Sequence, residues 1–279
     1  NLYISTDFGY VYSINYINGA INWSKNIGIP LRGSPTVDNG KLFFISILNQ
    51  TYALEANTGN ILWLHSGLPE TTSFLGGVSP AVKNNIVISP YSSGNVYAFN
   101  SDDGKVIWAK KLIESSSRLS MIELSDIHSR PVIDGREVYL SGSGGKLISA
   151  DIFSGKTKWT KEISTLSSPW VSGNFIYLIT SESQLICIHK VSGLIKWVNN
   201  LPRYKKQNKL EDKILWVGPI LVSDRLVLLS SNGTMLAISP YSGKALGNTK
   251  LSSEALIEPV IAMGTMIVLT DDGYLTAYK

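Results

Sequence analysis

A hairpin motif recurs along the chain at intervals of about 40 to 50 residues, and this repeat constrains the fold more than any other feature. Its clearest copy is TYALEANTGNILW, residues 51–63. Apolar residues first alternate with other residues, as in a half-buried strand. A turn segment follows at residues 57–60, in which Gly59 can adopt a positive φ. A second strand then ends in Trp63, so each copy predicts a β-hairpin that carries a tryptophan.

Five copies of the motif end in tryptophan, and these residues lie 38 to 51 positions apart. They are Trp23, Trp63, Trp108, Trp159 and Trp197. We assign Leu246 to the same place in a sixth copy, and the chain ends within a seventh. We expect these tryptophans to dock neighbouring repeat units onto each other rather than to stack on a ligand, because one large aromatic residue per unit is what such packing requires.

A second pair of strands precedes each hairpin. In SPAVKNNIVIS, for example, a proline opens a short apolar strand, an asparagine turn follows, and a longer apolar strand comes next. Each repeat therefore has four strands, A to D in chain order, which is the signature of a β-propeller blade. One blade cannot bury both of its faces alone, so neighbouring blades must stack. The sequence predicts an all-β fold in which residues 1–279 form a single β-propeller domain of four-stranded antiparallel blades.

Both ends of the chain match incomplete blades. The first segment, NLYIS, corresponds to strand B, and the last, YLTAYK, corresponds to strand C. Seven blades are therefore visible, of which the first lacks strand A and the last lacks strand D. A ring of blades has to close, because an open sheet edge promotes aggregation. We therefore expect the natural protein to continue upstream of Asn1, where any signal peptide or lipid anchor would also lie.

The composition argues against several classes of function. No apolar run reaches the roughly 18 residues of a membrane-spanning helix. The net charge of +4 is mild, and no stripe of aromatic and basic residues indicates nucleic-acid binding. Cys187 is the single cysteine, so no internal disulfide can form, and its alternation with Leu185 is typical of a core residue. The histidines, His65, His128 and His189, lack metal-ligand spacing.

The repeat resembles that of a known family. The pattern in ALEANTGNILW is similar to the repeat of PQQ-dehydrogenase-like propellers, and it recurs over essentially the whole chain. One branch of that family contains quinoprotein dehydrogenases, which place a disulfide of adjacent cysteines against PQQ and hold Ca²⁺ near a catalytic aspartate. The other is the BamB branch, whose members are outer-membrane lipoproteins with eight blades. A chain whose one cysteine is Cys187 resembles the second branch more closely, which implies no enzymatic activity, no PQQ and no metal.

The BamB resemblance also implies a binding surface. LPETTSFLGG is similar to a connection of that branch with exposed aliphatic residues, although Leu75 stands in place of an arginine. LSDIHSRPV is similar to its acidic segment, with His128 where a second acidic residue would stand. These stretches follow Trp63 and Trp108 in consecutive blades, so we expect them to form one epitope. The expected protein-binding residues are Thr72, Phe74, Leu75, Gly76, Asp126 and His128.

Several interpretations of these connections stay open. The long connections are binding loops or tolerated insertions. Phe74 and Leu75 contact a partner or fold back over the blade, and Asp126 pairs with a partner or caps its own loop. A third long connection follows Trp197 and is basic. Its positive residues, which form a solvated flap or contact acidic protein or lipid headgroups, are Arg203, Lys205, Lys206 and Lys209.

The resemblance implies a scaffold on the periplasmic face of the outer membrane of a Gram-negative bacterium. Such a protein binds the POTRA domains of the barrel-assembly protein BamA, as a monomeric subunit of a hetero-complex. It has no nucleic-acid partner and meets the membrane through its N-terminal lipid anchor alone. Two other interpretations remain: a PQQ-dependent dehydrogenase or other ligand-binding propeller, and a generic protein-interaction propeller.

Overall fold

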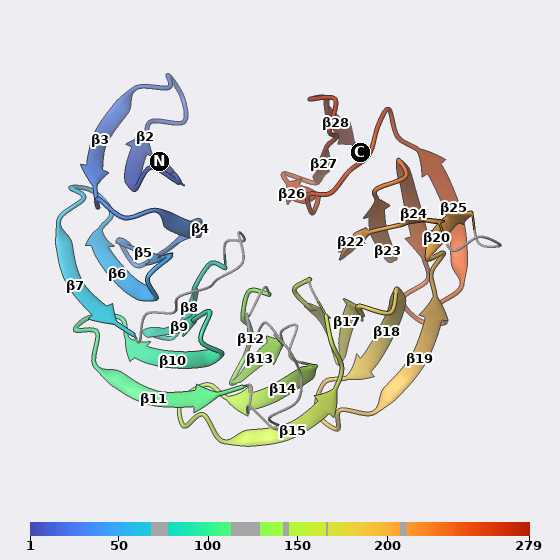
Figure 1. Ribbon diagram of the computed structural model, residues 1–279, viewed down its shortest axis with the longest axis horizontal. Coiled ribbons are helices and arrows are strands. Elements are labelled where there is room, and N and C mark those ends of the chain that lie inside the picture. Colours follow the sequence, from blue (N-terminus) through green and yellow to red (C-terminus); the bar gives the residue numbers. More distant parts are fainter. Residues whose placement is uncertain (68–77, 113–128, 142–144, 166, 207–210) are drawn as a thin grey trace. The chain divides into compact units, whose positions relative to one another are not determined.

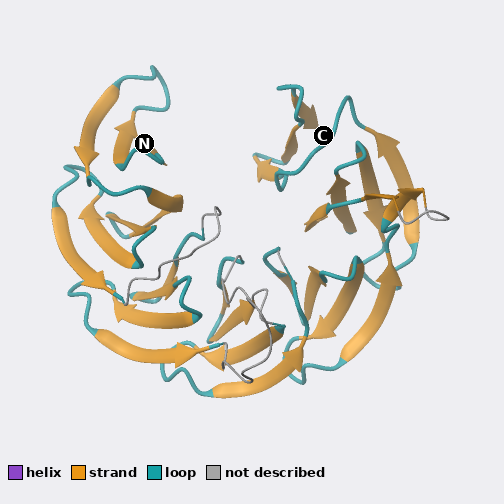
Figure 2. Ribbon diagram, viewed as in Figure 1, coloured by secondary structure: helices purple, strands orange, loops and turns teal. Residues whose placement is uncertain are grey.

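The chain folds into antiparallel β-sheets. The computed structural model describes residues 1–67, 78–112, 129–141, 145–165, 167–206 and 211–279 (Figure 1). The regular secondary structure of these residues consists of β-strands (Figure 2). Among them there is no helix that could cross a membrane. The sheets are the blades of a β-propeller, which confirms the predicted fold class. Contacts between residues divide the chain into two compact units, Asn1–Glu162 and Ile163–Lys279.

The first unit contains four sheets, in which the strands follow each other in chain order from the inner to the outer edge (Figure 1). The strands are β1 (Leu2–Ser5), β2 (Tyr10–Ile14) and β3 (Ile21–Asn26); β4 (Leu31–Asp38), β5 (Lys41–Ser46), β6 (Gln50–Glu55) and β7 (Ile61–Ser66); β8 (Ala81–Lys83), β9 (Ile86–Pro90), β10 (Asn95–Asn100) and β11 (Val106–Lys111); and β12 (Val132–Asp134), β13 (Glu137–Ser141), β14 (Lys146–Asp151) and β15 (Thr157–Glu162).

The second unit contains three blades and a separate two-stranded hairpin. The strands are β16 (Trp170–Ser172), β17 (Phe175–Ile179), β18 (Gln184–His189) and β19 (Ile195–Asn200); the hairpin of β20 (Tyr204–Lys206) and β21 (Glu211–Lys213); β22 (Trp216–Val222), β23 (Arg225–Ser230), β24 (Thr234–Ile238) and β25 (Ala245–Lys250); and β26 (Val260–Ala262), β27 (Thr265–Leu269) and β28 (Leu275–Tyr278). In the described residues, the β1–β3 and β26–β28 sheets have three strands each, as predicted for the first and last blades.

The prediction that proline opens strand A is confirmed in four blades and is wrong in two. β8, β12, β16 and β26 each start directly after a proline, whereas β4 and β22 start before Pro35 and Pro219. In these two strands, the pairing register shifts between Arg32 and Thr36 and between Val217 and Ile220. Proline has no N–H to donate, so the ladder is interrupted there and resumes beyond a bulge.

Successive side chains of the B and C strands fill two different cores, one on each face of the blade. In β5, for example, Phe44 packs in the cluster shared with the β1–β3 sheet, whereas its neighbour Phe43 packs in the cluster shared with the β8–β11 sheet. Both rings are fully buried. Each such side chain contributes roughly 1.5–3 kcal/mol of transfer free energy. Burial on both faces explains why these strands are continuously apolar in sequence rather than alternating.

The C-to-D turns share one hydrogen-bonded design that accounts for the repeated glycine. In the turn of the β4–β7 sheet, Gly59 N–H donates to Glu55 O, and Glu55 N–H donates to Asn60 O, both at 2.8 Å. The glycine has a φ of +74°, which L-residues with a side chain rarely adopt. Corresponding turns end in glycine at Gly19, Gly104, Gly155, Gly193 and Gly243, with φ values between +66° and +72°.

Tryptophans of the outer strands dock onto the C-to-D turn of the following sheet. Trp108 Nε1 donates to Ile152 O at 2.8 Å, and its indole lies so close to Gly155 that an added Cβ would be 2.7 Å from the ring. Three other tryptophans make the same hydrogen bond at 2.9–3.0 Å: Trp23 to Ala56, Trp63 to Ser101 and Trp197 to Pro240. Trp159 packs against Tyr139 within its own sheet, and its docking onto a following blade stays a prediction.

We predict that Gly155→Ala destabilises the first unit more than Gly19→Ala. Both glycines occupy the same turn position with positive φ, so both substitutions introduce backbone strain. Gly155 also lies against the Trp108 indole, whereas an added Cβ at Gly19 meets nothing within 4 Å. The difference in the free energy of unfolding, measured by urea denaturation, should be about 1–3 kcal/mol, the usual cost of overpacking. Equal losses in the two variants would contradict the indole contact.

We also predict that the first unit loses stability on mild acidification through His65. The ring of His65 lies 4.6 Å from that of Phe99 and 5.2 Å from that of Tyr97. Burial lowers the pKa of His65 below its ordinary value of 6.5, because an apolar environment disfavours the charged imidazolium. As pH falls, the unfolded chain therefore takes up the proton first. The stabilisation is complete above pH 6.5 and is lost as pH falls from there through the lower pKa of the folded state.

Urea unfolding at several pH values checks this effect. His65→Gln should remove part of the loss of stability on acidification, whereas His189→Gln, which keeps His65, should retain it. Parallel pH profiles for His65→Gln and the unsubstituted protein would show that His65 does not cause the loss.

Candidate functional site

The D-to-A connections and the B-to-C turns lie on one face of each unit, because neighbouring strands run antiparallel. We call this the connection face. On it, the residue that directly follows an outer strand donates its N–H to a B-to-C turn of the same sheet at 2.8–2.9 Å. These pairs are Ile27 N to Gly9 O, Leu112 N to Gly94 O, Leu201 N to Ser183 O and Leu251 N to Gly233 O. Each connection therefore leaves from a fixed backbone position.

In the first unit, buried polar contacts join the B-to-C turns of two neighbouring sheets. Asn49 Oδ1 accepts hydrogen bonds from Ser92 N at 3.0 Å and from Ser92 Oγ at 2.9 Å. Nearby, the hydroxyls of Thr51 and Tyr91 lie 2.8 Å apart, and Tyr91 is 1% exposed. Buried, fully paired networks of this kind fix one geometry. This part of the connection face is thus a rigid platform.

The two connections that we expect to bind a partner leave from neighbouring points of this platform. Gly67, where the first connection begins, packs so closely on Tyr91 that an added Cβ would be 2.5 Å from its ring. Leu112, where the second begins, donates its N–H to Gly94 in the same turn, residues 91–94. The chain returns at Val78 and Ser129, which are 2% and 1% exposed. One turn therefore contacts the start of both connections.

The residues named as protein-binding from the sequence lie outside the described residues. They belong to segments 68–77 and 113–128, and they are Thr72, Phe74, Leu75, Gly76, Asp126 and His128. Their role stays a prediction. The structure does describe the platform on which both segments begin, and its polar network was not foreseen from the sequence. Asn49, with a φ of +57°, carried the only local signal for it, as a residue tolerated in left-handed turns.

The third long connection forms the β20–β21 hairpin, and its basic residues are paired with acidic ones. Arg203 Nη2 lies 2.6 Å from Glu182 Oε2, in the B-to-C turn of the preceding blade. Lys205 Nζ lies 3.6 Å from Glu254 Oε1, in the next connection. These are exposed pairs, which contribute about 0–1 kcal/mol each. They offset much of the positive charge that the sequence indicated for this segment; Lys209 lies outside the described residues.

A cavity of about 380 Å³ opens on the connection face of the second unit, beside the foot of this hairpin. Serine and threonine residues line it together with aliphatic residues and Trp216. Leu215 and Leu256 at its rim are 47% and 41% exposed. This lining suits an apolar side chain of a bound protein segment, and Lys213 and Glu258 are the charged residues at its edge.

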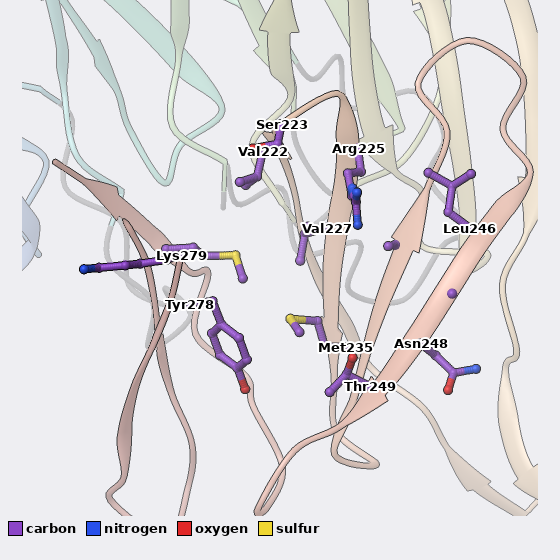
Figure 3. Close-up of a pocket in the computed structure, with 13 residues that line it drawn as sticks. Val222, Ser223, Arg225, Val227, Met235, Leu246, Asn248, Thr249, Tyr278 and Lys279 are labelled. Carbon is purple, nitrogen blue, oxygen red and sulfur yellow. The ribbon is translucent and has the colours of Figure 1, made fainter. Parts of the chain in front are cut away.

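A second cavity, of about 390 Å³, lies between the β22–β25 and β26–β28 sheets (Figure 3). The assignment of Leu246 to the place of the docking tryptophan is wrong: Gly247 in β25 pairs with Ala237 as Trp197 pairs with Cys187. Leu246, one residue earlier, lines this space and is 56% exposed. Tyr278 borders it from β28 and Met235 from β24 (Figure 3). Arg225 and Lys279 are its charged lining residues. Without a carboxylate or histidine among the described lining residues, the cavity has no acid–base pair for catalysis.

Cys187 and Asp151 are two titratable groups with a structural role. Cys187 is 1% exposed, and burial raises the pKa of its thiol to about 11, so it is neither a nucleophile nor a partner for a second cysteine. Arg136 Nε, 2.6 Å from Asp151, lowers the pKa of that carboxyl group to about 2. Asp151 also accepts hydrogen bonds from the N–H groups of Phe153 and Ser154 in its C-to-D turn.

The described residues do not match the cofactor site of a quinoprotein dehydrogenase. Within them, no three histidine, cysteine, aspartate or glutamate side chains come together as a metal site. The buried thiol of Cys187 cannot supply a disulfide of adjacent cysteines.

Comparison with known proteins agrees with the propeller fold. The family model described as "Outer membrane protein assembly factor BamB" matches residues 1–199. A BamB from Moranella endobia is 22% identical over 276 residues, which cover 99% of this chain and 69% of that protein. The crystal structure of BamB from Moraxella catarrhalis has a TM-score of 0.85 and 16% identity, over 99% of this chain and 81% of that one.

A europium-containing methanol dehydrogenase also shares the fold. Its TM-score is 0.69 at 12% identity, over 99% of this chain and 74% of that chain. Similarity at this level of identity shows the architecture alone, since one fold hosts unrelated functions.

Proposed function

The chain belongs to the outer membrane protein assembly factor BamB family, and we propose that it acts as a non-enzymatic scaffold that binds the POTRA domains of BamA. Membership over residues 1–199 is the observation that carries this proposal. In this role, the protein works on the periplasmic side of the outer membrane of a Gram-negative bacterium, as a lipid-anchored monomeric subunit of a hetero-complex.

We propose the connection face of the first unit as the contact surface. The platform around Tyr91 and Asn49 is rigid, and the two candidate connections leave from it side by side at Gly67 and Leu112. Loops held by a rigid scaffold are the usual place for binding residues. The contact residues are Thr72, Phe74, Leu75, Gly76, Asp126 and His128.

Strand edges and apolar grooves on the partner suit such loops. A connection can pair its backbone with an exposed sheet edge, or insert an apolar side chain into a groove. Phe74 and Leu75 supply the apolar anchor in this proposal, and Asp126 supplies a charged or capping contact.

The absence of enzymatic activity is part of the proposal. Two observations support it: Cys187 is a buried, free cysteine, and the described residues contain no metal-binding cluster. The dehydrogenase neighbour, at 12% identity, shares the propeller architecture alone.

We predict that Phe74→Glu and Asp126→Ala each weaken binding to a purified BamA POTRA segment. Interface energy is concentrated in a few buried residues, so each change should cost about 2 kcal/mol or more. Isothermal titration calorimetry measures the affinity, and thermal melting reports on folding. The matched control is Ile17→Glu, at a residue that is 79% exposed in a C-to-D turn on the opposite face. Unchanged binding in both test variants would remove this face as the contact surface.

We predict no PQQ-dependent turnover. The protein is incubated with PQQ and Ca²⁺, and dye reduction is followed with alcohols and sugars as substrates. The expected rate equals that of a blank without protein, because no cysteine pair and no acid–metal arrangement is found in the described residues. A rate above the blank would replace the scaffold proposal with an enzymatic one.

A further inference from the structure

One outer strand of the second unit has no ring at the docking position. A docking tryptophan pairs with a small residue of the neighbouring strand C, as Trp197 does with Cys187. In β25 the residue at this register position is Gly247, which pairs with Ala237. A Cβ added at Gly247 meets nothing within 4 Å. The space beside the strand is therefore not filled by a side chain at this position.

The cavity of about 390 Å³ between the β22–β25 and β26–β28 sheets includes this space (Figure 3). Gly247 and Ala237 line it, together with Met235, Met266 and Tyr278. Its volume is within the range of ligand pockets, about 300–1,000 Å³. Methionine side chains adapt their shape and make favourable contacts with aromatic rings. The lining therefore suits an aromatic side chain, the group that fills the corresponding place beside Trp197.

The charged residues around the cavity are mostly basic. Arg225 in β23 and Lys279 after β28 line it, and no aspartate or glutamate is among the described lining residues. Lys244 directly precedes β25. The acidic neighbour is Asp224, whose carboxylate lies 3.5 Å from the hydroxyl of Tyr241. Basic residues beside an apolar cavity favour a partner that has carboxylates next to its apolar anchor.

We propose that this cavity binds an aromatic side chain that is flanked by acidic residues on a partner protein. The inference goes beyond the proposed function, because it gives the scaffold a second binding surface for a partner other than the POTRA domains. The ring would fill the place that an indole fills in other blades, and the carboxylates would lie near Arg225 and Lys244. A large aromatic anchor in a pocket is a common energetic centre of protein interfaces.

The surroundings of the cavity favour this occupant over two others. A free aromatic acid would leave the apolar surface beside the cavity in water, where Leu246 is 56% and Tyr241 77% exposed, whereas a protein segment can cover it. A second copy of this chain would bring the same basic residues to a symmetric contact. Arg225 and Lys244 would then meet like charges, which repel each other across an interface.

A labelled peptide tests the proposal. Its tryptophan has two aspartates on each side, and fluorescence anisotropy of an attached fluorescein measures the Kd. The protein is used at its full natural length, including any residues that precede Asn1. Gly247→Trp places an indole of the chain's own in the cavity and should weaken binding at least about tenfold, which corresponds to about 1.4 kcal/mol. The matched control, Gly247→Ala, adds a methyl group for which there is room, and should bind like the unsubstituted protein.

Two peptide controls and one spectroscopic measurement separate the ring from the charges. A peptide with alanine in place of tryptophan, and one with lysines in place of the aspartates, should each bind at least about tenfold more weakly. NMR of isotope-labelled methionine methyl groups locates the bound ring. Its ring current should shift the signals of Met235 and Met266, which line the cavity, and leave that of Met263, which does not.

Thermal melting reports whether the variants fold. If Gly247→Trp does not, Leu246→Glu takes its place, because Leu246 is exposed at the cavity and a carboxylate there would repel the acidic peptide. Its control is Leu194→Glu, at a residue that is 60% exposed in the preceding blade. No binding by the unsubstituted protein, equal Kd values for each variant and its control, or unshifted signals of Met235 and Met266 would overturn the inference.

The same samples identify rival occupants and separate this inference from the proposed function. A dimer in light scattering that is lost in Gly247→Trp would assign the cavity to a second copy and overturn the inference. Indole-3-acetate that binds as tightly as the peptide would assign it to a free aromatic acid, with the same consequence. POTRA affinity should be unchanged in Gly247→Trp, and its loss would contradict a second partner. Peptide binding without POTRA binding would support this inference and refute the proposed function.

Discussion

The contact between an indole and the C-to-D turn of the next sheet is the interaction on which the rest of the structure depends. It combines the burial of a large ring, a hydrogen bond from Nε1 to a backbone carbonyl and a glycine whose missing side chain makes room for the ring. The hydrogen bond contributes about 1 kcal/mol, and truncation of a buried tryptophan costs about 3–5 kcal/mol. Stability of the blade stack therefore rests on one repeated contact more than on any single core residue.

This arrangement divides the work between the two faces. The C-to-D turns are engaged in docking: their glycine makes room for the indole, and a polar residue such as Asp151 caps the turn. The connections on the opposite face do not take part in tryptophan docking. They vary from short links to the β20–β21 hairpin, while buried contacts such as Asn49 to Ser92 keep their starting points fixed. Recognition can thus change on one face without weakening the stack.

The sequence predicted the fold well because the repeat reports packing directly. A turn glycine and a tryptophan recur together in the repeat because the tryptophan of one sheet packs against the turn glycine of the next, as Trp63 does against Gly104. Local sequence patterns predicted less where a strand is set by its pairing partner or has no apolar alternation. The register shift around Pro219 depends on pairing with β23, and the β20–β21 hairpin is too polar to show an alternation. The platform could not be foreseen, because Thr51 and Tyr91 are 40 residues apart and meet only through tertiary packing. The candidate contact residues lie outside the described residues, so they rest on sequence alone.

The docking contact also bears on how such a chain can change its length in evolution. The acceptor is a main-chain carbonyl, which has been seen here on alanine, serine, isoleucine and proline. The hydrogen bond therefore does not depend on the side chain of the residue whose carbonyl accepts it. A duplicated copy of one repeat brings both halves of the contact with it, the ring to give and the turn to receive. Gene duplication and loss can then add or remove whole blades, and each new neighbour is compatible from the start.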